Sequence, residues 1–124
     1  MNIALWILQI LLAVVFVMAG AMKLMQSKEQ IAEKMAWAND FSPGQIKLIG
    51  LAELLGALGL VLPGLTGILP ILTPLAAAGL ALTMVGAAVV HLRRGEGPMA
   101  VPSIVLLLLL LFAAYGRFVL VPLA

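Results

Sequence analysis

The 124-residue chain has no cysteine and few charges. Without cysteine, disulfide exchange, thiolate nucleophiles and Cys-ligated zinc or iron–sulfur sites are excluded. Small membrane bundles that oxidise thiols with a quinone are also disfavoured, because their chemistry needs cysteine pairs. Only 10% of the residues are charged, and the formal charge of +2 is scattered, so no nucleic-acid partner is expected.

Catalytic motifs are missing as well. The chain has no HExxH, no paired carboxylates and no glycine-rich phosphate loop; Gly95-Glu-Gly97 is too short to count as one. No metal site is therefore expected. Haem is disfavoured because it usually needs two axial ligands and His91 is the single histidine. Catalytic residues, if the protein has any, remain unknown at this stage.

Apolar residues dominate what is present, at 65% of the chain with a mean hydropathy of +1.24. Such values are typical of an integral membrane protein. The pattern predicts an all-α fold, an antiparallel four-helix bundle forming one transmembrane domain over residues 1–124. The predicted spans are residues 3–22, 43–62, 74–92 and 101–121.

The first span invites a signal-peptide interpretation, with Ala19-Gly20-Ala21 imitating a cleavage site. We favour a retained helix, because a basic leader segment is absent and the apolar run is too long.

Residues 27–39 predict a short amphipathic helix on the membrane surface. Ser27 and Gln30 form a capping box, and Ile31, Met35 and Ala38 share one side. A connector that covers the mouth of the bundle is favoured over a helix that docks a partner.

Helix ends are marked by serine, threonine and proline. Ser42 with Gln45 predicts a second capping box at the start of the 43–62 span, and Pro63-Gly64 predicts its end. Thr73 is expected to cap the third span, with Pro74 at its first position.

Glu53 is the one ionisable residue between Leu48 and Leu62. A carboxylate at this depth is costly and usually faces a bundle interior or a cavity. Helix lengths place Lys23, His91 and Thr83 within reach, so we expect one polar cluster of Glu53, Lys23, His91 and Thr83. If Lys23 pairs with Glu53, the carboxylate is charged and a structural role is open to it; if not, a neutral Glu53 can donate to a quinone carbonyl or carry a proton.

A second, outer pair is expected between Gln9 and Arg117, which lie at equal depth. Gln9 shares one helical face with Ala13, Phe16, Gly20 and Lys23. The alternative for Arg117 is an interfacial position beside Tyr115.

Positive charge is concentrated in two segments, 23–45 and 91–100. The positive-inside rule predicts that both face the cytoplasm and that both termini lie outside.

Several segments together resemble the DoxX and DoxX-like family of small four-helix membrane proteins. These are Gly20 with Lys23-Leu24, Gly50-Leu-Ala-Glu53-Leu-Leu-Gly56, Leu62-Pro63, Leu72-Thr-Pro74-Leu-Ala-Ala, and Met84 through His91-Leu-Arg-Arg-Gly-Glu96. The resemblance implies a bacterial inner-membrane protein in which Lys23, Glu53 and His91 match the family pattern. The family name derives from a subunit associated with quinone-linked oxidation, and relatives of the fold include assembly factors for receptor channels.

Three functions remain open. The first is a membrane subunit that binds a quinone-like apolar ligand beside Glu53 and associates with a redox system. The second is a non-enzymatic, chaperone-like assembly or scaffold protein with a membrane-protein partner. The weakest is a proton-coupled transporter that acts as a homodimer, since one chain is too short for an inverted repeat.

Overall fold

The computed structural model describes residues 1–123. Within that range the fold is helical throughout, as the sequence predicts. The elements are α1 (Asn2–Met25), α2 (Lys28–Lys34), the 3₁₀ helix η1 (Ala36–Asp40), α3 (Pro43–Thr66), α4 (Leu72–Arg93), α5 (Gly97–Tyr115) and the π-helical turn η2 (Gly116–Leu120).

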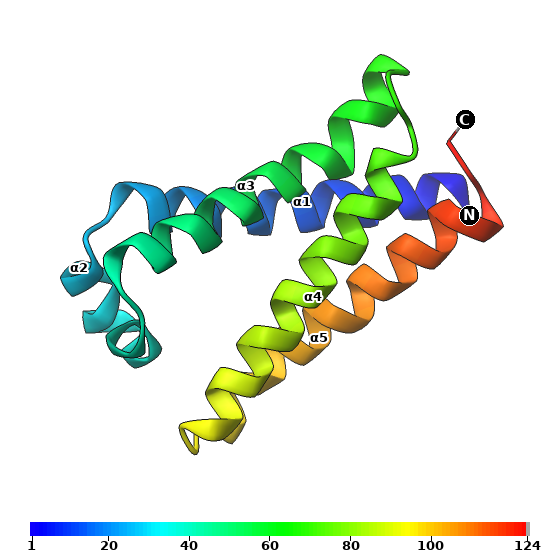
Figure 1. Ribbon diagram of the computed structural model, residues 1–124. Coiled ribbons are helices and arrows are strands. Elements are labelled where there is room, and N and C mark those ends of the chain that lie inside the picture. The colour runs from blue at the N-terminus through cyan, green and yellow to red at the C-terminus, as the bar shows by residue number, and fades with distance from the viewer. Residues whose placement is uncertain (124) are drawn as a thin grey trace.

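Four helices in the described part are long and apolar enough to cross a membrane: α1, α3, α4, and α5 continued by η2. They form two antiparallel pairs, because α1 packs mainly on α3 and α4 mainly on α5. The pairs meet through α3 and α4, and Figure 1 shows them crossing near the chain termini and diverging toward α2. We call the diverging side the loop end and the opposite side the terminal end.

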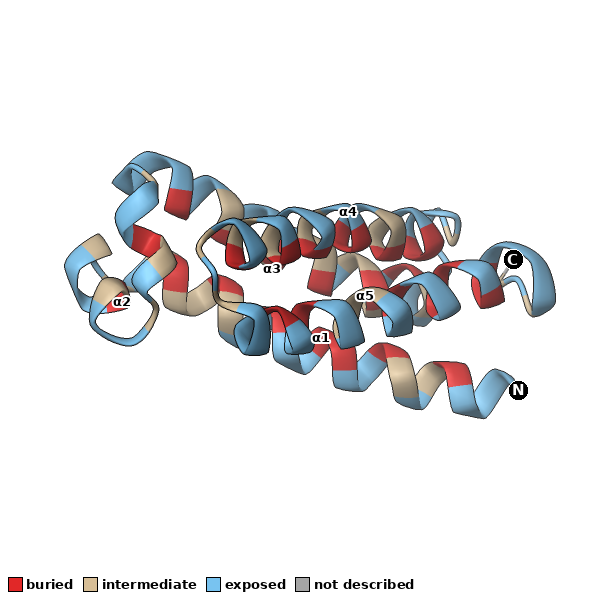
Figure 2. Cartoon of the chain, turned by 90° about the horizontal axis from the view of Figure 1, so that it is seen from below, coloured by how far each residue is buried: buried red, intermediate tan, exposed pale blue. Residues whose placement is uncertain are grey.

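Buried residues of the long helices face one another across the two pairs, whereas outward faces are exposed (Figure 2). The main core joins Phe16 of α1, Leu60 of α3, Leu80 of α4 and Leu110 of α5. Large apolar side chains such as Met18, Leu82 and Leu108 remain exposed on the outside. An apolar exterior over helices that satisfy their own backbone hydrogen bonds suits a lipid bilayer.

The end of α3 differs from the sequence-based expectation. The helix does not stop at Pro63 but continues to Thr66, and Gly67 caps it in the left-handed conformation with φ 74°. Pro63 has no N–H to bond the carbonyl of Gly59, and the Thr73 hydroxyl donates to that carbonyl instead, at 2.9 Å. The freed acceptor is thus satisfied and the helix passes through the proline.

The same contact corrects the predicted role of Thr73. The helix α4 begins at Leu72, with Ile71 at the N-cap position and no side-chain cap. The Thr73 hydroxyl serves a tertiary hydrogen bond between α4 and α3, which a local capping pattern does not anticipate.

The amphipathic segment is two short helices rather than one. Both predicted capping boxes are confirmed, with Ser27 bonded to Gln30 and Ser42 to Gln45. However, extended backbone at Met35 separates α2 from η1. The break turns η1 so that Ile31 and Ala38 both pack on Ile46 of α3.

The last span starts earlier than expected, at Gly97 instead of Val101, with a proline in its first turn. It also changes geometry at its end, where five residues form the π-helical turn η2 and the Val121 N–H donates to the Gly116 carbonyl at 2.7 Å. Widened turns of this kind are rare and frequently lie at functional sites.

Candidate functional site: a cavity beside a buried ion pair

Close contact between α1 and α3 positions the charged residues of the loop end. A Cβ atom on Gly20 would lie 2.6 Å from the Gly50 carbonyl oxygen, and one on Gly50 would lie 2.7 Å from the Lys23 Cβ. Only glycine permits this approach, since real Cβ atoms do not come so near to backbone. The stem of Lys23 therefore lies directly against α3, one helical turn from Glu53.

Lys23 and Glu53 form a buried ion pair. The Lys23 Nζ lies 2.7 Å from the Glu53 Oε1, and the two side chains are 9% and 4% exposed. The distance is that of a salt bridge, but the contact lacks hydrogen-bond geometry, and Oε1 has no hydrogen-bond donor among residues 1–123. We take the pair as an electrostatic contact that leaves the carboxylate with unused acceptor capacity.

A cavity of about 570 Å³ lies beside this pair, within the range of small-molecule sites. Both helix pairs contribute to its wall, as does η1 with its flanking residues. The wall is predominantly apolar and includes three aromatic side chains, Phe16, Trp37 and Phe41. The cavity is partly open rather than fully enclosed.

The structure brings all four residues of the predicted cluster to this cavity, because Lys23, Glu53, Thr83 and His91 all line it. Their interactions differ. The Thr83 hydroxyl donates within its own helix to the Gly79 carbonyl at 3.2 Å. His91 Nδ1 lies 3.1 Å from Glu96 Oε1, so its bonded partner is in the following turn rather than Glu53.

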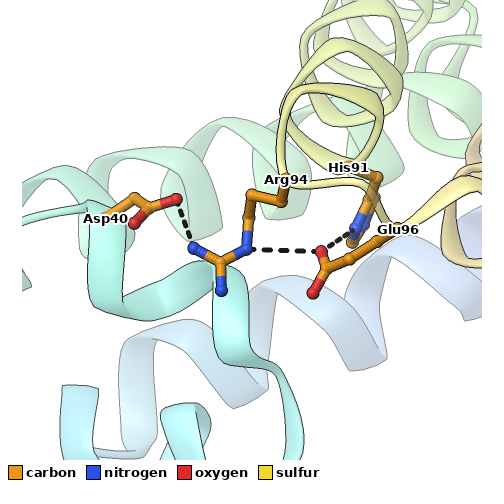
Figure 3. A network of polar contacts seen from close by, with 4 residues as sticks. All are labelled: Asp40, His91, Arg94 and Glu96. Carbon is orange, nitrogen blue, oxygen red and sulfur yellow. Dashed lines mark hydrogen bonds and ion pairs between the residues drawn. The ribbon is translucent and has the colours of Figure 1, made fainter.

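A polar network lies at the loop end, and one of its members, His91, lines the cavity (Figure 3). Arg94 NH1 donates to Asp40 Oδ2 at 2.5 Å, and Arg94 Nε lies 3.4 Å from Glu96 Oε1, which also contacts His91. The hydrogen bond that Arg94 donates to the Asp40 carboxylate raises the pKa of Arg94, so this guanidinium is charged at any pH used in practice. The network ties η1, whose Trp37 lines the cavity, to the turn between α4 and α5.

The outer pair has a different setting at the terminal end. Arg117 Nε donates to Gln9 Oε1 at 2.6 Å, and Gln9 Nε2 donates to the Leu60 carbonyl at 2.7 Å. Arg117 NH1 also reaches Asn2 Oδ1 at 2.8 Å, and the guanidinium carbon lies 5.6 Å from the centre of the Trp6 ring. Arg117 is 2% exposed, so its guanidinium lies inside the bundle rather than extending outward from it.

Several contributors to these sites were not singled out from the sequence. Asp40, Arg94 and Glu96 read as ordinary loop charges, and Asn2 as a polar residue at the chain start. Trp37 had no assigned role either, and the centre of its ring lies 5.7 Å from the Lys23 Nζ. No local pattern links these residues, because their partners lie on other helices.

The donor set limits the chemistry of the site. Within residues 1–123, no three His, Asp or Glu side chains gather where a metal ion would bind. What the cavity offers is a fixed cation, a carboxylate with acceptor capacity, a histidine and aromatic walls. This combination suits binding and orientation of an apolar molecule with a polar group.

Comparison with known proteins gives one result. The model of the DoxX-like family matches residues 7–113, which include all four residues of the predicted cluster. No curated protein and no solved structure matches the chain.

Proposed function

The chain belongs to the DoxX-like family, and from this premise we propose that it holds a quinone-like apolar ligand in the cavity beside Glu53. The observation that carries the proposal is the position of the Lys23–Glu53 pair in the wall of a 570 Å³ apolar cavity. A buried charge pair that served packing alone would not need such a space next to it.

The cavity is partly open, and we propose that its ligand enters from the bilayer. A lipid-soluble molecule already concentrated in the membrane reaches the space between the helix pairs without crossing water. We further propose that the protein presents this ligand to a membrane redox partner, since its own described residues offer no redox group.

Native mass spectrometry of protein extracted in mild detergent tests the proposal. We expect a stoichiometric adduct with the mass of a quinone-like molecule in the wild type. Glu53→Gln keeps the shape of the side chain and removes its charge, so we expect loss of the adduct from a protein that still inserts. Glu33→Gln is the matched control, because Glu33 is an exposed acid on α2 and should leave the adduct unchanged.

Other results would replace the proposal. A bare protein, or one that retains a second polypeptide and no small adduct, would favour the assembly or scaffold role. Flux driven by a pH gradient in reconstituted vesicles would favour the transporter, which requires a homodimer.

For the topology we propose a bacterial inner membrane with both polar segments, residues 23–45 and 91–100, in the cytoplasm. The basic residues at the loop end support this orientation. Since the chain lacks cysteine, Lys34→Cys creates a single thiol. A membrane-impermeant maleimide should label it in inverted vesicles and not in intact spheroplasts; the opposite result would reverse the topology.

A further inference from the structure

The Glu53 Oε1 atom, which receives no hydrogen bond from residues 1–123, distinguishes between ligands that the cavity could hold. An ammonium at 2.7 Å makes this a charged carboxylate, which accepts hydrogen bonds and donates none. Oε1 is buried and lacks a hydrogen-bond donor among the described residues. A buried acceptor without a donor is costly, so a ligand that supplies one gains affinity.

We infer that the cavity recognises a hydroxyl-bearing aromatic ligand, a phenol or the reduced quinol form of a quinone, rather than the oxidised form with carbonyls alone. This inference rests on the proposed ligand role of the cavity and specifies its chemical class. A hydroxyl group donates its hydrogen to the Glu53 carboxylate, and its oxygen can accept from the Lys23 ammonium. A carbonyl oxygen can accept a hydrogen bond from the Lys23 ammonium but has no hydrogen to donate to the Glu53 carboxylate.

The walls favour an aromatic ring over a plain alkyl alcohol. Phe16, Trp37 and Phe41 all line the cavity, and the rings of Trp37 and Phe41 are 5.6 Å apart in an edge-to-face arrangement. Aromatic pairs of this kind add affinity beyond the area that they bury. Trp37 also lies close to the ion pair, 5.7 Å from the Lys23 Nζ, so a ring bound at the pair contacts it.

Trp37 supplies a direct readout. The chain has two tryptophans, Trp6 at the terminal end and Trp37 in the cavity wall. In the Trp6→Phe protein, reconstituted into nanodiscs, the fluorescence of Trp37 reports the cavity alone. The probes are 4-nonylphenol and 4-nonylanisole, which share ring and tail and differ in having a hydroxyl or a methoxy group.

We expect the phenol to bind about 10-fold to 100-fold more tightly than the ether, the ratio expected for a hydrogen bond to a charged group. Replacing the pair by apolar side chains of similar length, Lys23→Met with Glu53→Met, should reduce this preference to within about twofold, because the donor then has no charged acceptor. Each probe partitions into the nanodisc lipid to the same extent with either protein, so partitioning cancels when the phenol-to-ether preference of the variant is compared with that of the parent. Decyl-benzoquinol should likewise bind more tightly than decyl-benzoquinone, because only the quinol carries hydroxyl donors.

If the double variant does not fold, Glu53→Gln takes its place, with a preference expected to fall at least several-fold. Glu33→Gln in the same background should leave the preference intact. Equal binding of phenol and ether, tighter binding of the quinone, or a preference that survives loss of the pair would each overturn the inference and leave the ligand role standing. Failure of all four probes to bind would overturn the ligand role as well.

Discussion

Two buried cations at opposite ends of the bundle are stabilised in different ways. At the terminal end, all three nitrogens of Arg117 are hydrogen bonded to uncharged oxygens of Gln9, Asn2 and the backbone. At the loop end, Lys23 faces the charged Glu53 in the wall of a cavity, and the Glu53 Oε1 retains acceptor capacity. A buried charge with all its partners inside the protein fastens helices together, whereas one with an unused partner beside a cavity is suited to binding.

The largest expected loss of stability comes from removing one partner of the Lys23–Glu53 ion pair. Lys23→Met leaves the Glu53 carboxylate buried and uncompensated, so we expect a loss of about 3–5 kcal/mol in the free energy of unfolding. Titration with SDS in mixed micelles measures it.

Adding Glu53→Met to Lys23→Met should recover most of that stability, because an apolar pair replaces the ionic one without a lone charge. The protein would then be stable and unable to prefer a phenol. A double variant no more stable than Lys23→Met would mean that the inner pair is structural like the outer cluster.

Removal of the outer cation, Arg117, should lower the free energy of unfolding by less than Lys23→Met does. Its partners are uncharged oxygens, so no single substitution of a countercharge restores that stability. Arg117→Leu leaves the Gln9 and Asn2 oxygens without their donor, and we expect a loss of about 2–4 kcal/mol with cavity ligands still bound. Arg93→Leu removes an exposed arginine and should change stability by less than about 0.5 kcal/mol. Loss of ligand binding in Arg117→Leu would contradict the separation of the two ends.

The glycine contact behind the inner pair can be tested by adding one methyl group. Gly20→Ala would place its Cβ 2.6 Å from the Gly50 carbonyl oxygen, so α1 must shift away from α3, at a cost of about 1–3 kcal/mol. Gly79→Ala meets open space and should be neutral or slightly stabilising. Equal unfolding curves for the two variants would show that close contact of α1 and α3 is not required.

The smallest effect on stability, but a clear one on access, is expected at the loop end of the cavity. Ser103→Cys places a single thiol in the cavity wall, and a water-soluble maleimide then reports access. Arg94→Ala removes the ion pair to Asp40 and should speed labelling several-fold, whereas Arg93→Ala should not. High salt should speed labelling in the parent and not in Arg94→Ala, since exposed ion pairs are screened; equal rates throughout would mean that this network does not restrict access.

Much of this fold follows from local patterns. Uninterrupted apolar runs predict the spanning helices, and the two Ser–Gln capping boxes define the starts of α2 and α3. Counting residues along the helices also places Thr83 roughly level with Glu53, and Lys23 and His91 at helix ends within reach of it. Local patterns failed where a partner on another helix intervened, as when Thr73 satisfied the carbonyl that Pro63 leaves free.

The sequence by itself determined that the chain is a membrane helix bundle with a few costly polar side chains inside, because a long apolar run satisfies its own backbone in hydrocarbon as a helix, and buried charges there are usually paired. The tertiary structure decided how these polar groups meet and which others join them, such as Glu96 beside His91. Glycine contact at Gly20 and Gly50 sets Lys23 against Glu53, and divergence of the helix pairs leaves space beside them. Such distances depend on how helices cross, and a crossing is fixed by the packing of residues far apart in the chain.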